Sequence, residues 1–369
     1  MNNESMDNRI PVTLLTGFLG AGKTTLLNHL IRDPEAGRVA VIMNEFGDVG
    51  LDHDLIEAAT EETILMESGC LCCTIRRDLI KTLSKLSARR RRGELGFDRV
   101  IIETTGIADP GPILHCLAAG NSVAASFRMD GVVTVADAAT GAETLDRQFE
   151  SVQQLAMADL IVLSKTDLVD PSALARFEAR LEQINSTAKR VRAERGRVPV
   201  GVLFGLSAMR GGVQEDDVAA WLGAEAAKPD PLAGLSGFSQ VLQGGAQPAA
   251  LPFAATAQPA PLDHRIASAS ISVETPIPAE VFDFWLDTLI ALKGPNVLRM
   301  KGILHVEGLA YPFVFHGVQH VFDAPVPMKS WSGDDTTSRV VVIARDMTEE
   351  ELQASLSLLL RRKTEKPAM

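Results

Sequence analysis

Short apolar runs alternate with longer amphipathic stretches from Pro11 to about Leu206. The runs have the composition of buried strands, and the stretches between them place Leu and Ile at helical spacing. This alternation predicts an α/β domain with a doubly wound, mostly parallel sheet, which binds its ligands at the carboxyl ends of the strands. The predicted strands are Val12–Leu15, Val39–Met43, Val100–Ile102, Val132–Val135, Leu160–Leu163 and Val200–Phe204.

The pattern changes near Lys228. Residues 228–262 are rich in Ala, Pro, Gly, Ser and Gln and show little periodicity, which predicts a flexible linker. A small α+β domain is expected beyond it, so the predicted boundaries are 1–227, 228–262 and 263–369. Its expected elements are strands at Ile266–Val273, Leu298–Val306, Pro312–Phe322 and Val340–Ala344 and helices at Val281–Leu292 and Glu349–Leu360.

The segment from Gly17 to Thr25 matches the P-loop pattern G-x-x-x-x-G-K-[ST]. It lies between a predicted strand and a predicted helix, where backbone N–H groups and the positive helix end can meet a polyphosphate. Lys23 can reach the β- and γ-phosphates, and the Thr24 hydroxyl can bind Mg²⁺. The predicted phosphate-binding residues are Gly17, Gly20, Ala21, Gly22, Lys23, Thr24 and Thr25.

A second marker is the acid at the end of the predicted strand Val100–Ile102. Glu103 follows that strand, as the Mg²⁺ side of a P-loop site requires. We expect Glu103 to hold the Mg²⁺ shell through water, and Gly106 to let the backbone approach a γ-phosphate. The alternative is a strand-end acid that faces solvent.

Ser164-Lys165-Thr166-Asp167 follows a buried apolar run and resembles the guanine-reading N-K-x-D loop of P-loop GTPases. An Asp carboxylate there accepts two hydrogen bonds that adenine cannot supply, which favours GTP over ATP. Ser164 replaces the usual Asn, and the alternative is an ordinary loop with Asp167 as a helix N-cap. Ser207, after the run Val200–Phe204, is a weaker candidate for the last loop around the base.

Three of the four cysteines are clustered in Gly69-Cys70-Leu71-Cys72-Cys73. Clustered thiolates suit a soft or borderline ion such as Zn²⁺. Cys70 and Cys72 can face one way on an extended segment, whereas adjacent Cys72 and Cys73 would be strained as joint ligands. The alternative is buried, inert cysteine.

Together these residues resemble the CobW family of P-loop metallochaperone GTPases, and its YjiA-like branch in particular. The resemblance implies GTP hydrolysis coupled to the handling of Zn²⁺ or Co²⁺. It also implies a switch segment at Asn44–Gly47, with Glu45 and Asp48 as further candidate metal contacts. Met43 stands where the branch can have a carboxylate, and a His-rich stretch is absent from the sequence. The matching segments are Thr16–Thr25, Asn44–Gly47, Gly69–Cys73, Glu103–Gly106, Ala108–Pro112, Ser164–Asp167, Leu298–Leu304 and Phe315–Gln319.

Charge and composition narrow the partners. A formal net charge of −11 argues against a basic nucleic-acid-binding surface, and no apolar run is long enough to span a membrane. The polar first residues lack a signal core, so a cytoplasmic protein is expected. The run Arg89–Arg92 is interpreted as a solvated helix end and His115 as a structural residue. His305, His316 and His320 are interpreted as partly buried or surface residues rather than a metal site.

The leading hypothesis is a GTP- and Mg²⁺-dependent chaperone that delivers Zn²⁺ or Co²⁺ to a client metalloprotein. The oligomeric state is left open, with a homodimer as one candidate. One alternative is a cobalt-directed GTPase in cobalamin assembly. The other is a GTP-regulated interaction module whose cysteines sense zinc or redox state without transferring metal.

Overall fold

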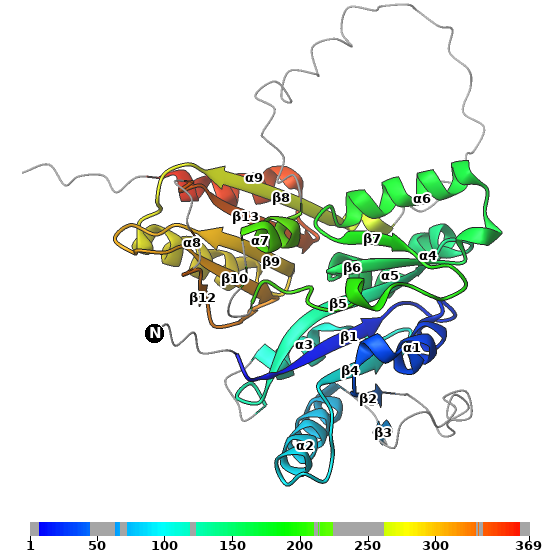
Figure 1. Ribbon diagram of the computed structural model, residues 1–369. Coiled ribbons are helices and arrows are strands. Elements are labelled where there is room, and N and C mark those ends of the chain that lie inside the picture. Colours follow the sequence, from blue (N-terminus) through cyan, green and yellow to red (C-terminus); the bar gives the residue numbers. More distant parts are fainter. Residues whose placement is uncertain are drawn as a thin grey trace, which may run out of the picture.

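The structure is a computed structural model of two domains joined side by side (Figure 1). Within the described residues the chain forms a seven-stranded sheet and a six-stranded sheet. The described residues are 7–44, 63–66, 72–118, 123–209, 213, 215–223, 262–329, 331 and 335–361.

The first sheet is parallel throughout, with strand order β3-β2-β4-β1-β5-β6-β7. Such a sheet needs helical crossovers, which cover both of its faces and bury its strands. The predicted α/β class is therefore confirmed for this domain. Its strands are β1 (Ile10–Thr16), β2 (Val39–Asn44), β3 (Thr63–Met66), β4 (Arg99–Thr104), β5 (Phe127–Asp137), β6 (Leu160–Ser164) and β7 (Lys189–Arg192).

Helix α1 packs on one face of this sheet, and α2, α3, α5 and α6 pack on the other. Successive β1 residues alternate between the two cores, because Leu14 belongs to one and Leu15 to the other. The helices of this domain are α1 (Lys23–Arg32), α2 (Cys72–Arg91), α3 (Gly111–Ala118), α4 (Gly141–Arg147), α5 (Phe149–Ala156) and α6 (Pro171–Ile184). Helix α7 (Glu215–Leu222) follows them in the chain and packs on the sheet of the second domain, against Ile303 and Val314.

The last strand of the sheet is not the one predicted. The run at Val200–Phe204 forms a 3-10 turn over Val200–Val202, and Val200 and Leu203 pack in the core beside α1. Their spacing of three puts both side chains on one face of such a turn. The seventh strand is instead the Lys- and Arg-rich β7, an edge strand in which Val191 alone is hydrophobic. Charged edge strands lack the apolar signal by which buried strands are recognised.

The second domain is an antiparallel sheet covered on one side by helices α8 and α9. The predicted strand over Pro312–Phe322 is divided at Gln319, whose φ of 56° turns the chain between β10 and β11. The predicted linker spans residues 228–262, and of these all but Leu262 lie outside the described residues. The elements are β8 (Ile266–Val273), α8 (Ala279–Lys293), β9 (Val297–Leu304), β10 (Phe313–Val318), β11 (Val321–Phe322), β12 (Val326–Pro327), β13 (Ser338–Arg345) and α9 (Glu349–Leu356).

A buried ion cluster joins the two domains. Arg299 and Lys301 of β9 both pair with Asp159, which precedes β6, and all three side chains are at most 4% exposed. Burial raises the pKa of Asp159, but the charges of Arg299 and Lys301 outweigh it and hold that pKa far below its ordinary value. Burial lowers the pKa of Lys301 to about 8, so the lysine stays protonated at neutral pH. The cluster is therefore fully charged where the domains meet.

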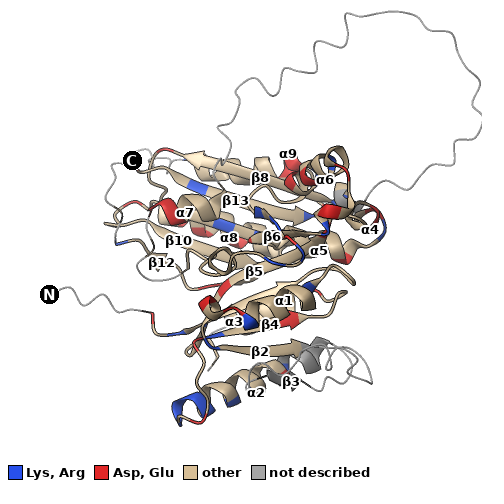
Figure 2. Ribbon diagram, turned by 45° about the vertical axis from the view of Figure 1, so that its right-hand side comes forward, with Lys and Arg blue, Asp and Glu red and all other residues tan. Residues whose placement is uncertain are grey.

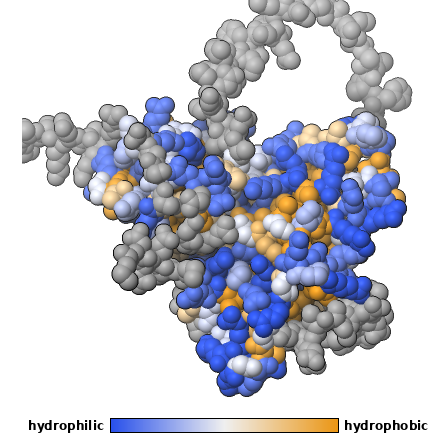
Figure 3. Space-filling model, in the orientation of Figure 1, coloured by the Kyte–Doolittle hydropathy of each residue, from blue (hydrophilic) through white to orange (hydrophobic). Residues whose placement is uncertain are grey.

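The basic run Arg89–Arg92 is exposed to solvent, as the sequence predicted. Arg89, Arg90 and Arg91 end α2 at the tip of the first domain, where Figure 2 shows a cluster of cations. This tip is hydrophilic in the space-filling view (Figure 3). Arg90 donates to the carbonyl of Phe97 and Arg91 to the hydroxyl of Ser87, so part of the run caps local structure. Among the described residues, no helix has the length and apolar content needed to cross a bilayer.

Asp159→Asn should lower the free energy of unfolding by about 3–5 kcal/mol, because it leaves Arg299 and Lys301 buried without a counter-charge. Urea denaturation measures this, with Asp98→Asn, in an exposed pair with Arg38, as the control.

The pKa of Asp159 is lowered on folding, so its stabilisation is present above the unfolded pKa and is lost as the pH falls. The difference in the free energy of unfolding between Asp159→Asn and wild type should stay constant down to about pH 5 and become smaller below about pH 4. A variant as stable as wild type at pH 7 would contradict the role of the cluster.

Candidate nucleotide and metal site

The P-loop connects the end of β1 to α1 and is shaped by three glycines. Gly17, Gly20 and Gly22 have φ values of 139°, 74° and 100°, in the region that side chains disfavour. A Cβ on Gly17 would lie 2.4 Å from the carbonyl oxygen of Val135 on β5, so only glycine fits there. Gly22 is the N-cap of α1, and no side chain of the described residues caps this end of the helix. Successive N–H groups in such a turn form a concavity suited to an anion.

Lys23 and Thr24 begin α1 and point to different parts of the site. Lys23 is buried, and its Nζ donates to the carbonyl oxygens of Gly17 (2.8 Å) and Phe18 (3.2 Å), so it folds back over the loop. Thr24 Oγ1 donates to Glu103 Oε1 at 3.0 Å. Glu103 is buried on β4, directly beside β1 in the parallel register. The sheet therefore brings the predicted hydroxyl and carboxylate together.

Gly106 follows β4 and lies directly against the P-loop. A Cβ at this position would be 2.5 Å from the backbone nitrogen of Leu19, so any other residue would displace the loop. The carbonyl oxygen of Gly106 accepts a hydrogen bond of 3.1 Å from the side chain of Gln154. Gly106 therefore lies against the phosphate loop, and its predicted approach to a γ-phosphate stays a prediction.

The loop after β6 holds the P-loop from the other side. Ser164 Oγ donates to the carbonyl oxygen of Ala21 at 2.7 Å, and Lys165 Nζ donates to that of Gly20 at 2.9 Å. Lys165 has a φ of 54°, a left-handed conformation that turns its side chain back toward the P-loop. Ser164 therefore makes a contact with the P-loop although it is not the usual Asn.

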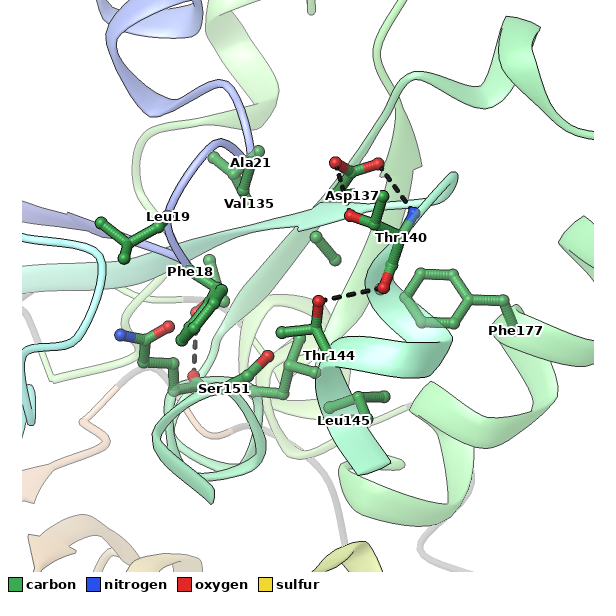
Figure 4. A pocket seen from close by; sticks show the side chains of 15 residues that line it. Phe18, Leu19, Ala21, Val135, Asp137, Thr140, Thr144, Leu145, Ser151 and Phe177 are labelled. Atoms are coloured by element: carbon green, nitrogen blue, oxygen red, sulfur yellow. Dashed lines mark hydrogen bonds between the residues drawn. The ribbon is translucent and has the colours of Figure 1, made fainter. Parts of the chain in front are cut away.

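Asp137 is a member of the site that the sequence analysis missed. It ends β5, and its carboxylate pairs with Lys165 Nζ at 2.6 Å and accepts a hydrogen bond from Thr140 (Figure 4). Burial raises the pKa of Asp137, but the hydrogen bonds from Lys165, Thr140 and the Ala139 amide outweigh it and lower the pKa overall. An acid directly after a buried strand was the signal that identified Glu103, and the same signal marks Asp137.

Asp167 is exposed beside this loop, in the 3-10 turn Thr166–Leu168. It is not the cap of the following helix, because Asp170 performs that role by accepting from the amides of Ser172 and Ala173. The alternative interpretation of Asp167 as an N-cap is therefore wrong. Its carboxylate lies at the sheet edge that carries the P-loop.

The prediction for Ser207 is wrong. The amide of Gly205 donates to Asp130, near the amino end of β5, whereas the P-loop lies at the carboxyl end, which Asp137 marks. These two ends are about 20 Å apart in a strand of this length. Ser207 accepts from the amide of Met209, and Met209 packs with residues of the second domain. The chain after Val200 turns back along the sheet because that segment is not a strand.

A different segment, the one that follows β7, lies at the carboxyl ends of the strands, on the same edge as the P-loop. Glu194 and Arg197 exchange two backbone hydrogen bonds of 3.0 Å and enclose a two-residue turn of Arg195 and Gly196, both with positive φ. A Cβ on Gly196 would be 2.7 Å from the side chain of Thr25, so the turn rests on the first turn of α1. A cavity of about 970 Å³ adjoins the turn, within the size of small-ligand sites. Its lining residues are His29, Arg192, Glu194, Arg195, Arg197, Val198 and Pro199.

The cysteine segment is only partly described. Cys72 and Cys73 begin α2, which corrects the expectation that Cys72 continues an extended segment, while Cys70, Glu45 and Asp48 lie outside the described residues. Within the part that is described, no three His, Cys, Asp or Glu side chains form a group suited to a metal ion.

His115 and His320 meet at the junction of the domains, whereas His305 lies within the second domain. His115 Nε2 is 3.2 Å from the carbonyl oxygen of Val318, and its ring packs edge-on against that of His320. His316 is buried and its Nδ1 is 3.1 Å from Asp323. The ring of His305 packs against Trp331. These contacts agree with structural roles.

Known proteins match this chain along both domains. The family model for the CobW/HypB/UreG nucleotide-binding domain matches residues 11–192, and the model for the cobalamin synthesis protein cobW C-terminal domain matches residues 266–360. The zinc chaperone YjiA of Escherichia coli is 30% identical over 350 residues, which is 95% of this chain and 98% of that protein. The chain belongs to the CobW family. As a CobW protein with a P-loop domain, it is a GTPase.

Further relatives support the same assignment. The crystal structure of Zn(II)-bound YjiA GTPase from E. coli aligns with a TM-score of 0.67 at 28% identity, covering 96% of this chain and 100% of that one. The zinc chaperone CobW of Pseudomonas aeruginosa is 37% identical over 234 residues, 54% of this chain and 60% of that protein. The predicted CobW resemblance, its two-domain fold class and the GTPase activity are confirmed.

Asp167→Asn should weaken GTP binding about a hundredfold and shift preference to xanthosine triphosphate, since the amide reverses one hydrogen-bonding group at the base. Competition binding with the two nucleotides measures this. Asp170→Asn is the matched control: the same change three positions on, at a helix cap that Asn also satisfies. Unchanged GTP affinity in Asp167→Asn would remove it as the guanine reader.

Proposed function

We propose that this GTPase is a metal chaperone that couples its nucleotide state to the binding and release of a divalent transition metal, with Zn²⁺ as the first candidate cargo. The observation that carries the proposal is that β3, the last described strand before the cysteines, ends at the edge of the sheet that carries the P-loop. Met66 ends β3 in register with Asn44 of β2, and Asn44 is in register with Thr104 of β4, next to Glu103. The chain therefore leaves β3 at the P-loop edge, and the next described element is α2, which begins at Cys72. The names of the zinc chaperones YjiA and CobW support the same function.

The residues at the phosphate end fit a Mg²⁺ ion. Mg²⁺ prefers hard oxygen ligands, and the Thr24 hydroxyl and Glu103 carboxylate meet within 3.0 Å at the N-terminus of α1. When bound, the ion neutralises charge on the β- and γ-phosphates. We assign Thr24 to direct contact and Glu103 to the surrounding water shell. Lys23 and the amides from Gly17 to Thr25 would hold the phosphates.

We place the nucleoside end between the loops that follow β6 and β7. These strands are neighbours, with Leu163 in register with Arg192, so Asp167 and the turn at Arg195-Gly196 flank one region of the sheet edge. Lys165 is paired with Asp137, and its charge is therefore balanced before any ligand arrives. A balanced lysine suits packing on an uncharged base better than binding phosphate. The Arg195 turn replaces Ser207 in this assignment.

The proposed metal ligands are Cys70, Cys72 and Cys73, with Glu45 and Asp48 as further contacts in the switch. Thiolates select borderline and soft ions, and an incomplete protein shell leaves a position from which metal can be transferred to an apo client protein. If GTP tightens metal binding, metal must tighten GTP by the same factor. Hydrolysis then lowers metal affinity and permits delivery.

Glu103→Gln should lower GTP turnover about a hundredfold, because it weakens the charge that positions Mg²⁺ near the phosphates. The Mg²⁺ concentration needed for half-maximal turnover should also rise. Steady-state hydrolysis over a Mg²⁺ titration measures both effects, and Glu143→Gln, in an exposed pair on α4, is the control. Wild-type turnover at low Mg²⁺ would contradict the assignment of Glu103.

Cys72→Ser should weaken Zn²⁺ binding at least about a hundredfold while GTP affinity stays near wild type, since a serine hydroxyl is neither deprotonated at neutral pH nor a soft ligand. The matched control is Cys116→Ser, because Cys116 is buried on α3 and its thiol donates to the carbonyl oxygen of Pro112, away from the cysteine segment. In wild type, Zn²⁺ should bind more tightly with Mg²⁺ and a non-hydrolysable GTP analogue than with GDP. Equilibrium titration in both orders measures the coupling. Equal Zn²⁺ affinity in the two nucleotide states would leave a zinc-binding GTPase without coupled release.

A further inference from the structure

Gln154 of α5 is buried beneath the nucleotide site and bonds to the loop after β4. Its residue exposure is 1%, and its Nε2 donates to the carbonyl oxygens of Gly106 and Ala108, both at 3.1 Å. The backbone carbonyl of Gln154 accepts from Thr134 Oγ1 of β5 at 2.9 Å. Gln154 therefore uses both of its side-chain N–H groups on one short segment and is itself held by the sheet.

That segment is pressed between Gln154 and the P-loop. On one side Gly106 approaches the backbone of Leu19 so closely that a Cβ would lie 2.5 Å from its nitrogen. On the other side the amide of Gln154 fixes the carbonyl of Gly106. The peptide on either side of Gly106 is thus restrained at the point where the backbone faces the phosphate loop.

A small cavity lies on the same side, between the P-loop and helices α4 and α5 (Figure 4). Phe18 and Leu19 of the P-loop line it together with Ser151 and Gln154 of α5. Its volume is about 20 Å³, which is room for one water molecule. Gln154 Oε1 is buried with no hydrogen-bond partner in the described structure, so the amide orientation is set by its donors.

Helix α5 is in turn anchored at its C-terminal end, directly after Gln154. Asn185 Nδ2 donates to the carbonyl oxygens of Leu155, Ala156 and Ala158 at 2.9–3.1 Å, and Arg299 of the second domain donates to that of Met157. A helix held in this way is a fixed support for the amide of Gln154. The support reaches from the interdomain ion cluster to the nucleotide site.

We infer that Gln154 is a positioning residue that holds the Gly106–Ala108 segment against the P-loop in the geometry that receives the γ-phosphate of GTP. The inference rests on the proposed placement of the γ-phosphate beside Gly106. GDP lacks that group, so the restraint acts on GTP affinity and leaves GDP affinity nearly unchanged. A residue with a merely structural role would alter stability or both affinities together.

The test compares Gln154→Leu with Gln153→Leu. Both residues are buried on α5, and the substitutions are the same, but the structure assigns the bonds to Gly106 and Ala108 only to Gln154. With Mg²⁺ present, Gln154→Leu should bind a non-hydrolysable GTP analogue about tenfold more weakly, as expected for lost buried hydrogen bonds. Its GDP affinity should stay within about twofold of wild type, and Gln153→Leu should keep the wild-type ratio of the two affinities.

Gln154→Met is the second variant, because it keeps the length of the side chain, removes both N–H donors and buries no charge. It should reduce the analogue-to-GDP affinity ratio as much as Gln154→Leu. An unchanged ratio in a folded Gln154→Met protein overturns the inference, and so does an equal loss for both nucleotides. Lys23→Ala in the same titration separates the two proposals: if it leaves both affinities unchanged, the P-loop assignment itself fails.

Discussion

The P-loop keeps its shape because the ends of neighbouring parallel strands bond to it directly. Glu103 of β4 accepts from Thr24, while Ser164 and Lys165 after β6 donate to carbonyls of the loop. Parallel strands present all their carboxyl ends at one edge, so residues distant in sequence meet there without a long loop. These bonds satisfy backbone and side-chain groups that a glycine-rich loop cannot satisfy internally. A rigid anion cradle follows from the sheet rather than from the glycines alone.

The second domain is joined to this sheet through charge as well as apolar contact. Asp159 precedes β6, so the ion cluster with Arg299 and Lys301 holds the strand whose far end carries the loop proposed to read guanine. Arg299 also bonds to Met157, just after α5. Buried ion clusters are poor sources of net stability but tolerate few alternative arrangements. The cluster therefore fixes how the second domain meets β6 and α5, and both elements lead to the nucleotide.

The sequence predicted the features that depend on local patterns. A strand, a glycine-rich loop and a helix are contiguous around Lys23, and the acid of Glu103 directly follows its apolar run, so each was recognisable in one window of the chain. The prediction that Ser207 lies in a loop around the base was wrong, because it depended on a strand at Val200–Phe204. An apolar run of that length fits a packed 3-10 turn as well as a strand. The true edge strand β7 is mostly charged and carries no such signal.

Contacts between distant segments could not be predicted in the same way. Gln154 is one glutamine in a helix, and nothing in its neighbourhood indicates that its amide reaches Gly106 and Ala108 across the sheet edge. Asp137 carried a signal, but its pairing with Lys165 depends on the left-handed turn after β6. Gln154 and Asp137 set the position and the charge balance of residues that the sequence motifs identify, such as Gly106 and Lys165. The motif provides affinity for phosphate, whereas the inferred restraint by Gln154 on the segment beside Gly106 bears on the discrimination between GTP and GDP.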